Sequence, residues 1–263
     1  MLSNGTYKCK RCHDTGMILV TKVCGADVYG EDKPLVFTQP CPKCNGGHEI
    51  QVQKVRQRAN IPHSFYDSKL SDFDWAAYKN EKDEVIDLSK QKQFVDSFVD
   101  NFPKWQEQGL GLYFWSGIRG TGKTYLASCV CNELMARYHM VTKFVSASDL
   151  INLDQEGKKN NYEKNPIDVL SECMLLVIDD LGQQKTGEAY LDDILFRIID
   201  HRYQNKLVTM ITSNIELKKL RLDDRVSDRL NKMCQPIPLP DISFRQKESN
   251  QNKRDFFKDM GLM

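Results

Sequence analysis

The feature that most constrains this chain is one short glycine-rich run, Gly117-Ile-Arg-Gly-Thr-Gly-Lys-Thr124. It fits the pattern G-x-x-x-x-G-K-[S/T], in which backbone amides of a loop close around phosphate oxygens. The pattern is informative between a strand and a helix, because the start of the helix adds its partial positive charge to the same site. Apolar runs predict that context here, so a chance match of a glycine-rich loop is the weaker alternative.

The segments around this loop alternate between predicted strands and helices. Residues 81–99 carry apolar side chains at roughly helical spacing and predict an amphipathic helix. The expected strands are residues 111–115, 141–145, 174–178 and 207–212, and further helices are expected at 124–138 and 189–203. This order is typical of βαβ units. We therefore expect an α/β fold with a mainly parallel sheet flanked by helices.

Several polar residues are expected to build a nucleotide site at one edge of that sheet. Lys123 suits the β- and γ-phosphates of ATP, and the Thr124 hydroxyl suits Mg²⁺. Asp179 and Asp180 follow a buried strand, where Asp179 would hold Mg²⁺ and Asp180 would orient or deprotonate water. Asn214 follows the next strand and could bind the γ-phosphate or that water, although polar turns often end strands. The expected ATP and Mg²⁺ ligands are Gly117, Gly120, Thr121, Gly122, Lys123, Thr124 and Asp179.

Cysteine spacing predicts a separate metal module at the N-terminus. Five of the nine cysteines lie in the first 44 residues, and two Cys-x₂-Cys pairs are separated by 28 residues. Two such pairs can supply the four ligands of a tetrahedral Zn²⁺ site, although a redox pair is the alternative. The expected Zn²⁺ ligands are Cys9, Cys12, Cys41 and Cys44, with Cys24, His13 and His48 as competitors. The other cysteines, Cys129, Cys131, Cys173 and Cys234, are expected in the core.

These patterns divide the chain into a zinc-binding module (1–50), a connector (51–80) and an ATPase domain (81–263). A net charge of +1 gives no overall attraction to nucleic acid, so any such site must be local. The longest purely apolar run, 174–178, is too short to cross a bilayer, and the first ten residues lack a signal-peptide core. We therefore expect a cytoplasmic protein without a membrane partner.

Together the motifs resemble those of the bacterial and phage DnaC/DnaI-type helicase loaders. These are AAA+ proteins related to the DnaA initiator and the IstB transposition ATPase. The resemblance runs from about Ala59 to the C-terminus. Besides the P-loop, it rests on Ile61-Pro62 with Phe65 and Phe73, Ile178-Asp-Asp-Leu-Gly182, Thr212-Ser-Asn214, Arg225-Val-Ser-Asp-Arg229-Leu and Ser243-Phe-Arg245. It implies that Asn214 is sensor 1, Arg229 the arginine finger (with Arg225 as the alternative) and Arg245 sensor 2.

The resemblance also implies a function. It predicts an ATP-dependent homo-oligomer that places a ring helicase on single-stranded DNA, with the zinc module contacting the helicase. Asp180 stands where many AAA+ proteins outside the loader and initiator group carry Glu, which suggests slow hydrolysis and use of ATP as a switch. Residues 152–166, with Lys158, Lys159 and Lys164, occupy the place of a DNA-facing insertion, although a solvated loop is an alternative. Rival functions are an IstB-like transposition regulator and a zinc-dependent nucleic-acid-binding protein whose P-loop has lost turnover.

Overall fold

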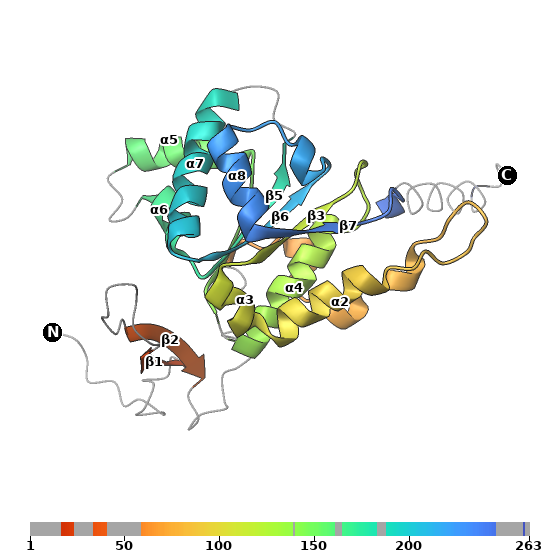
Figure 1. The fold of residues 1–263 in the computed structure, drawn as a ribbon, viewed down its shortest axis with the longest axis horizontal. Coiled ribbons are helices and arrows are strands. Elements are labelled where there is room, and N and C mark those ends of the chain that lie inside the picture. The colour runs from red at the N-terminus through yellow and green to blue at the C-terminus, as the bar shows by residue number, and fades with distance from the viewer. Residues whose placement is uncertain are drawn as a thin grey trace.

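A parallel five-stranded sheet forms the centre of the molecule (Figure 1). The computed structural model describes the backbone of residues 17–23 and 34–40 and, beyond them, residues 59–138, 140–160, 165–182, 188–245 and Met260. The sheet order is β4-β5-β6-β3-β7, and every neighbouring pair is parallel. The strands are β3 (Gly111–Trp115), β4 (Thr142–Ser146), β5 (Leu175–Leu181), β6 (Val208–Ser213) and β7 (Cys234–Pro238). The predicted α/β fold is confirmed.

Helices cover both faces of the sheet (Figure 1). One face carries α2 (Ser89–Asp100), α3 (Phe102–Gln108) and α4 (Lys123–Tyr138). The other carries α5 (Asp149–Lys159), α6 (Pro166–Glu172), α7 (Glu188–Gln204) and α8 (Asp224–Met233). Strand side chains alternate between two cores: Leu112 and Phe114 belong to the first and Tyr113 to the second. This alternation is what a strand buried on both faces requires.

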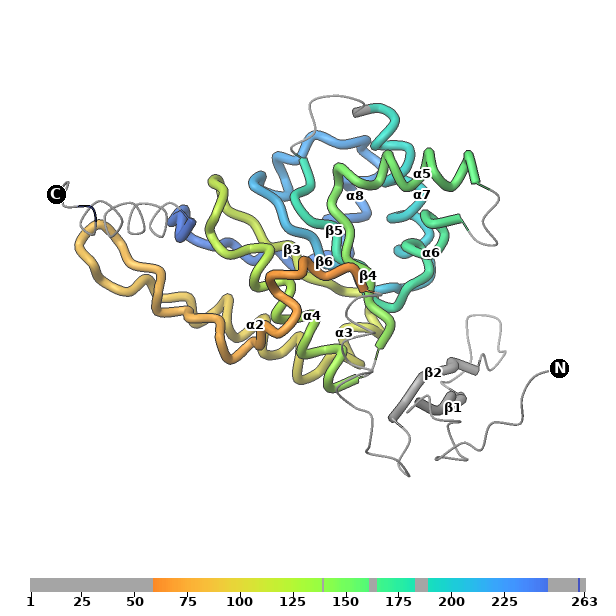
Figure 2. Tube along the Cα trace, turned by 180° about the vertical axis from the view of Figure 1, so that it is seen from behind, coloured from red at the N-terminus to blue at the C-terminus, as the bar shows by residue number. Residues whose placement is uncertain are grey.

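The described part of the connector packs against α4 (Figure 2). It contains three short 3₁₀ helices, His63–Phe65, Leu70–Asp72 and Trp75–Ala77. The Asn132 side chain of α4 donates hydrogen bonds to the carbonyls of Phe65 and Ser68, both at 2.9 Å. Phe73 and Tyr78 are buried in the same core as α4. The connector is therefore held in place by the sheet domain.

The helix expected within residues 81–99 begins later than its spacing predicts. Val85 is 56% exposed and bridges Lys79 in antiparallel fashion, around a turn in which Asp83 has φ +63°. Helix α2 begins only at Ser89, whose amide donates to the Asp87 carboxylate at 2.9 Å. The expectation that Val85 lies in the helix was wrong, because this local turn precedes the helix start.

Strand β7 at the edge of the sheet was not predicted. Its Ile237 is buried, whereas Pro236 and Pro238 are exposed. The amide of Leu239, just beyond the strand, donates to the carbonyl of Trp115 at 2.8 Å. Proline usually argues against a strand, so the alternating apolar residues of this segment do not by themselves indicate one.

The four cysteines outside the N-terminal region are buried free thiols, as predicted.

Arg202 of α7 is fully buried and joins the end of α6 to the start of β6. Its guanidinium donates to the carbonyls of Leu170, Ser171, Cys173 and Val208 and to the Thr209 hydroxyl. Among the described residues, no helix is long and apolar enough to span a bilayer.

Two antiparallel strands lie near the N-terminus. They are β1 (Met17–Val23) and β2 (Pro34–Pro40), which pair along their full length. In sequence both fall between the two Cys-x₂-Cys pairs. All four predicted Zn²⁺ ligands, and their competitors Cys24, His13 and His48, lie outside the described residues. Among the residues that are described, no group of three or more His, Cys, Asp or Glu side chains could hold a metal.

Candidate nucleotide-binding site

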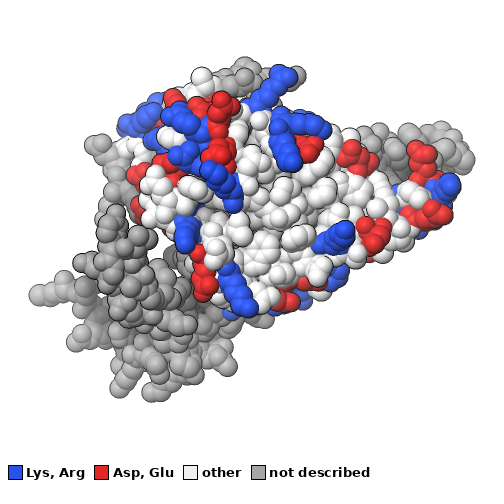
Figure 3. All heavy atoms as spheres, viewed as in Figure 1, with Lys and Arg blue, Asp and Glu red and all other residues white. Residues whose placement is uncertain are grey.

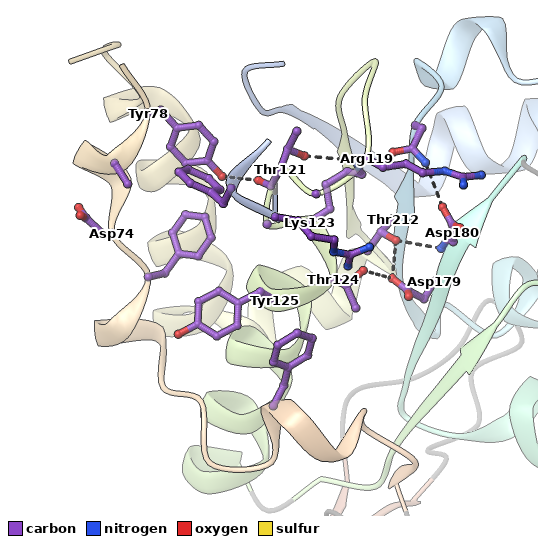
Figure 4. Close-up of a pocket in the computed structure, with 18 of the residues that line it drawn as sticks. Asp74, Tyr78, Arg119, Thr121, Lys123, Thr124, Tyr125, Asp179, Asp180 and Thr212 are labelled. Carbon is purple, nitrogen blue, oxygen red and sulfur yellow. Dashed lines mark hydrogen bonds between the residues drawn. The ribbon is translucent and has the colours of Figure 1, made fainter. Parts of the chain in front are cut away.

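The polar residues that follow β3, β5 and β6 meet at one edge of the sheet. Because β6 lies between β3 and β5, the carboxyl ends of these three strands are adjacent. They open onto a cavity of about 640 Å³ (Figure 4). Of the predicted site residues, the cavity is lined by Gly120, Thr121, Gly122, Lys123, Thr124, Asp179, Asp180, Asn214 and Arg245. Gly117, Arg225 and Arg229 are not among the described residues that line it.

The backbone of the P-loop is held from outside the cavity. Gly120 and Gly122 have φ of +79° and +88°, values that favour glycine. The Tyr78 hydroxyl donates to the carbonyl of Thr121 at 2.6 Å, and burial raises the pKa of this tyrosine. The amide of Phe244 donates to the carbonyl of Gly120 at 2.9 Å. The connector and the segment after β7 thus fix the loop before any ligand binds.

Gly117 faces the segment after β7 rather than the cavity. Its amide donates to the Asp241 carboxylate at 2.6 Å. A Cβ at this position would lie 2.8 Å from the same carboxylate, so a larger residue would displace Asp241. The structure therefore places Gly117 in a supporting position at the base of the loop.

Lys123 is a buried cation surrounded by neutral oxygens. Its side chain is 6% exposed, and the ammonium donates to Ser116 Oγ (2.7 Å), the Ile118 carbonyl (2.8 Å) and Thr121 Oγ1 (3.2 Å). Burial lowers its pKa to about 8, although Asp180, Asp241 and Asp179 partly oppose this shift. A buried ammonium without a directly bound carboxylate fits an anionic ligand such as a phosphate.

Thr124 and Asp179 form a cluster of oxygen atoms beside Lys123. The Thr124 hydroxyl donates to Asp179 Oδ1 at 2.9 Å, and the Thr212 hydroxyl donates to the same oxygen at 2.5 Å. Burial raises the pKa of Asp179, while these two hydroxyls and Lys123 act in the opposite direction. Hydroxyl and carboxylate oxygens are the hard ligands that Mg²⁺ prefers. The residues present therefore fit the predicted metal.

Asp180 occupies a strained position at the end of β5. The predicted strand end at Ile178 was too early, because β5 continues to Leu181 through an irregular pairing with β6. Asp180 has φ +58°, which is uncommon for a residue other than glycine and recurs at functional sites. The Asn214 amide donates to Asp180 Oδ1 at 3.1 Å. The two residues expected near the attacking water are therefore in contact.

The far end of the cavity is aromatic, which sequence analysis did not predict. Phe73 stacks on Tyr125 with ring centres 6.0 Å apart, and Figure 4 shows Tyr78 and Tyr125 opposite the acidic end. Phe65 and Phe244 also line this end. Arg119, a variable position of the P-loop, lines the cavity as well. The available signal was the aromatic composition of the connector, but its place against the P-loop depends on packing against α4.

The two candidate arginine fingers lie together on α8. Arg225 pairs with Asp223 through Nε (2.9 Å) and Nη2 (3.0 Å), and its guanidinium lies 4.1 Å from the ring centre of Phe196. Arg229 pairs with Asp200 of α7 at 2.5 Å and donates to the Arg225 carbonyl at 2.9 Å. The Arg225 side chain is 57% exposed and that of Arg229 is 23% exposed. On the face that α7 and α8 share, basic and acidic side chains interleave (Figure 3).

The candidate DNA-facing segment, residues 152–166, contains most of α5 and the first residue of α6. Lys158 pairs with the buried carboxylate of Asp154 at 2.7 Å and lies 3.0 Å from the Tyr190 hydroxyl. Arg197 binds the same carboxylate, and these partners lower the pKa of Asp154 to about 2. Lys158 is therefore committed to an ion pair, and Lys159 is exposed. Lys164 lies outside the described residues.

The strand order places a P-loop after β3, an acidic end on β5 and a polar end on β6. This arrangement defines an AAA+ P-loop protein. The family of IstB-like ATP binding proteins matches residues 104–252, which is more than half of the 263 residues. The chain belongs to this family.

The chain is also similar to curated relatives, and it shares the fold of solved structures. "Replicative helicase loader DnaC" of Escherichia coli K12 is 35% identical over 147 residues, which cover 54% of this chain and 56% of that relative. The match thus spans little more than half of the relative's length. The crystal structure of DnaI superposes with a TM-score of 0.55 and 24% identity over 71% of this chain and 96% of DnaI. The DnaC helicase loader gives a TM-score of 0.55 and 20% identity over 67% and 99%.

Proposed function

We propose that this protein is an ATP-switched loader that places a replicative ring helicase on single-stranded DNA. The observation that carries the proposal is one cavity in which the P-loop lysine, the Thr124–Asp179 pair and the Asn214–Asp180 pair meet. It occurs in a chain that is 35% identical, over 147 residues, to a protein named as a helicase loader. The size of the cavity suits a nucleotide, because ligand pockets commonly measure about 300–1,000 Å³.

In this proposal ATP lies across the cavity with its phosphates at the P-loop. The Lys123 ammonium exchanges neutral oxygens for the β- and γ-phosphates, so its buried charge gains a counter-charge. Thr124 and Asp179 would hold Mg²⁺, whose charge would partly offset that of the phosphates. The aromatic end receives the base, with the Phe73 and Tyr125 rings beside it. Arg119 and Arg245 line the same cavity and add positive charge near the phosphates.

Hydrolysis is proposed to be slow and to serve as a switch. Asp180 is the base or the residue that orients water, and Asn214 holds its carboxylate. A carboxylate on the short Asp side chain reaches less far into the cavity than Glu would. A general base must come within hydrogen-bond reach of its water, so a shorter reach lowers the rate.

Arg229 is proposed to complete the ATP site of a neighbouring subunit, with Arg225 as the alternative. Neither residue is among those described as lining the cavity of its own subunit, which suits action in trans. The γ-phosphate of a neighbour would compete with Asp200 for the Arg229 guanidinium. Oligomerisation would then depend on ATP. An arginine finger is typically worth about 10³–10⁵ in rate.

Mixing two defective variants tests this role. Lys123→Ala removes the P-loop cation and Arg229→Ala removes the finger, so each variant alone should hydrolyse little ATP. In mixed assemblies some interfaces combine an intact P-loop with an intact arginine, and hydrolysis should partly return. If Arg229→Ala alone keeps full activity, the assignment moves to Arg225.

The N-terminal module and the α5 segment are proposed as the contacts to partners. A two-stranded antiparallel sheet lies between the two Cys-x₂-Cys pairs in sequence, which suits a small fold held by Zn²⁺. This module would bind the helicase. The segment around Lys159 would contact single-stranded DNA, beside the ion pair that holds Lys158.

The deciding experiment measures ATP hydrolysis by the full chain with a replicative ring helicase, with single-stranded DNA and with both. We expect the combination to change the rate and the helicase to become bound to DNA only when the loader has an intact Lys123. A chain that instead responds to a transposase on double-stranded DNA would fit the IstB-like transposition role. A chain that binds DNA but never hydrolyses ATP would contradict the proposed switch.

A further inference from the structure

Thr212 of β6 links the two acidic residues of the site through a single oxygen atom. Its side chain is 1% exposed. The hydroxyl donates to Asp179 Oδ1 at 2.5 Å and accepts a hydrogen bond from the Asp180 amide at 2.9 Å (Figure 4). A threonine hydroxyl has only one proton. Because the Asp180 amide occupies an acceptor position, that proton is directed at Asp179.

The second of these bonds stabilises an irregularity in the sheet. Strand β5 pairs Ile178 with Ile211 and Leu181 with Ser213, so it carries one residue more than β6 over this stretch. The extra residue takes the Asp180 amide out of the strand pairing and places Asp180 at φ +58°. An amide without a partner would disfavour this backbone conformation. The Thr212 hydroxyl supplies the missing acceptor.

The first bond differs in kind from the one that Thr124 makes. Both Thr124 and Thr212 donate to Asp179 Oδ1. Thr124 is itself an expected metal ligand, so its position would depend on the metal as well as on Asp179. Thr212 has no such role in the proposed site, and its hydroxyl also holds the Asp180 amide.

We propose that Thr212 is a positioning residue of the nucleotide site. With one hydroxyl it holds the Asp179 carboxylate for Mg²⁺ and keeps Asp180 in the backbone conformation that presents its carboxylate to the attacking water. This inference rests on the ATP-binding part of the proposed function and does not depend on the helicase or DNA partners.

Three variants separate positioning from packing. Thr212→Val keeps the shape but removes the donor and the acceptor, whereas Thr212→Ser keeps the hydroxyl and removes only a methyl group. Thr209→Val is the matched control, because Thr209 is equally buried in β6 and its hydroxyl binds Arg202 at 2.9 Å. Thr209 is not among the described residues that line the cavity. Thermal unfolding of each variant reports the loss of stability.

The test measures binding of a fluorescent ATP analogue to the full chain while Mg²⁺ is titrated, with Mn²⁺ and electron paramagnetic resonance as an independent measure of metal affinity. We expect similar binding of the analogue to all variants without metal, because the P-loop is unchanged. Thr212→Val should need about 10–100 times more Mg²⁺ for the half-maximal change in binding of the analogue. This is the usual range when a metal ligand loses its hydrogen-bond partner. Thr212→Ser and Thr209→Val should stay close to the wild type.

Two results would overturn the positioning role. One is a Mg²⁺ requirement of Thr212→Val that equals that of Thr209→Val. The other is a Mg²⁺ requirement of Thr212→Ser raised about 10-fold or more over the wild type, which would assign the effect to the methyl group; this measurement needs only the serine variant and the wild type. A wild-type chain whose ATP binding never responds to Mg²⁺ would instead refute the proposed nucleotide site, and the positioning role with it.

Discussion

The buried ammonium of Lys123 leads to a prediction about stability as well as activity. Burial lowers its pKa from 10.5 to about 8. At about 1.4 kcal/mol per pKa unit, keeping this amine charged at neutral pH costs the phosphate-free native state roughly 3 kcal/mol. Lys123→Met removes the charge and nearly preserves the length of the side chain. We therefore expect this variant to lose ATP binding and yet to unfold less readily than the wild type at pH 7.

The hydrogen bonds that Lys123 makes reduce the gain in stability expected for Lys123→Met. The Ser116 and Thr121 hydroxyls can still bond to each other, since they lie 2.7 Å apart. The Ile118 carbonyl loses one of two donors, because the Ser116 hydroxyl also donates to it at 3.0 Å, and this loss costs at most about 1 kcal/mol. The net stabilisation should be about 1–2 kcal/mol at pH 7, which corresponds to roughly 2–8 °C in Tm for a domain of this size.

The pH dependence has a definite sign. The pKa of Lys123 is lower in the native state than in the unfolded chain, so between pH 8 and 10.5 the unfolded chain holds a proton that the native state has released. Stability rises with pH where the unfolded state binds more protons. The free energy of unfolding of the wild type should therefore rise relative to that of Lys123→Met from about pH 8 upward. By about pH 10.5 the variant should no longer be the more stable of the two.

Urea unfolding of both proteins without nucleotide, followed by tryptophan fluorescence at pH 7, 8, 9 and 10, measures this difference. Lys104→Met on the exposed surface of α3 is the control and should leave the unfolding midpoint close to the wild type at each pH. A Lys123→Met variant that is less stable than the wild type at pH 7, or a difference that stays constant with pH, would refute the argument from the buried charge.

Three other predictions concern separate parts of the chain. Elemental analysis should find one Zn²⁺ per chain, which Cys41→Ser removes and Cys24→Ser leaves in place; metal-free protein purified under reducing conditions would contradict this. Lys159→Glu should weaken single-stranded DNA binding and flatten its salt dependence more than Lys158→Glu does, because Lys158 is paired with Asp154. Equal effects of the two variants in a filter-binding titration would argue against a DNA contact at Lys159. Arg202→Met should lower the free energy of unfolding by about 3–5 kcal/mol, because buried carbonyls lose their donor, whereas a loss below 1 kcal/mol would show that water replaces the guanidinium.

The sequence predicted that the polar residues of the site would meet at one edge of the sheet, because each of them follows a local pattern. The P-loop, the acidic end of β5 and the polar end of β6 each follow a recognisable strand, and parallel strands bring such ends to one edge. The structure brings Lys123, Thr124, Asp179, Asp180 and Asn214 to the same cavity. Their roles toward ATP and Mg²⁺ remain predictions.

What sequence missed depends on contacts between distant segments. The aromatic end of the cavity requires the connector to pack against α4, where Asn132 binds the Phe65 carbonyl. No local pattern indicates this contact. The pairing of Arg229 with Asp200 likewise joins α8 to α7. In β7 the prolines hid a strand that is stabilised by its pairing with β3.

Those prolines also limit how copies of this chain can join. Backbone amides alternate sides along a strand, and the Leu239 amide points toward β3. Positions 236, 238 and 240 therefore face away from the sheet, and each is a proline that lacks an N–H group. The surface around β7 carries few charges (Figure 3), so the missing donors, rather than charge repulsion, prevent another strand from adding to this edge. The β7 edge is thereby closed to strand addition, so copies that meet on this side of the sheet would have to join through side chains rather than through a shared sheet.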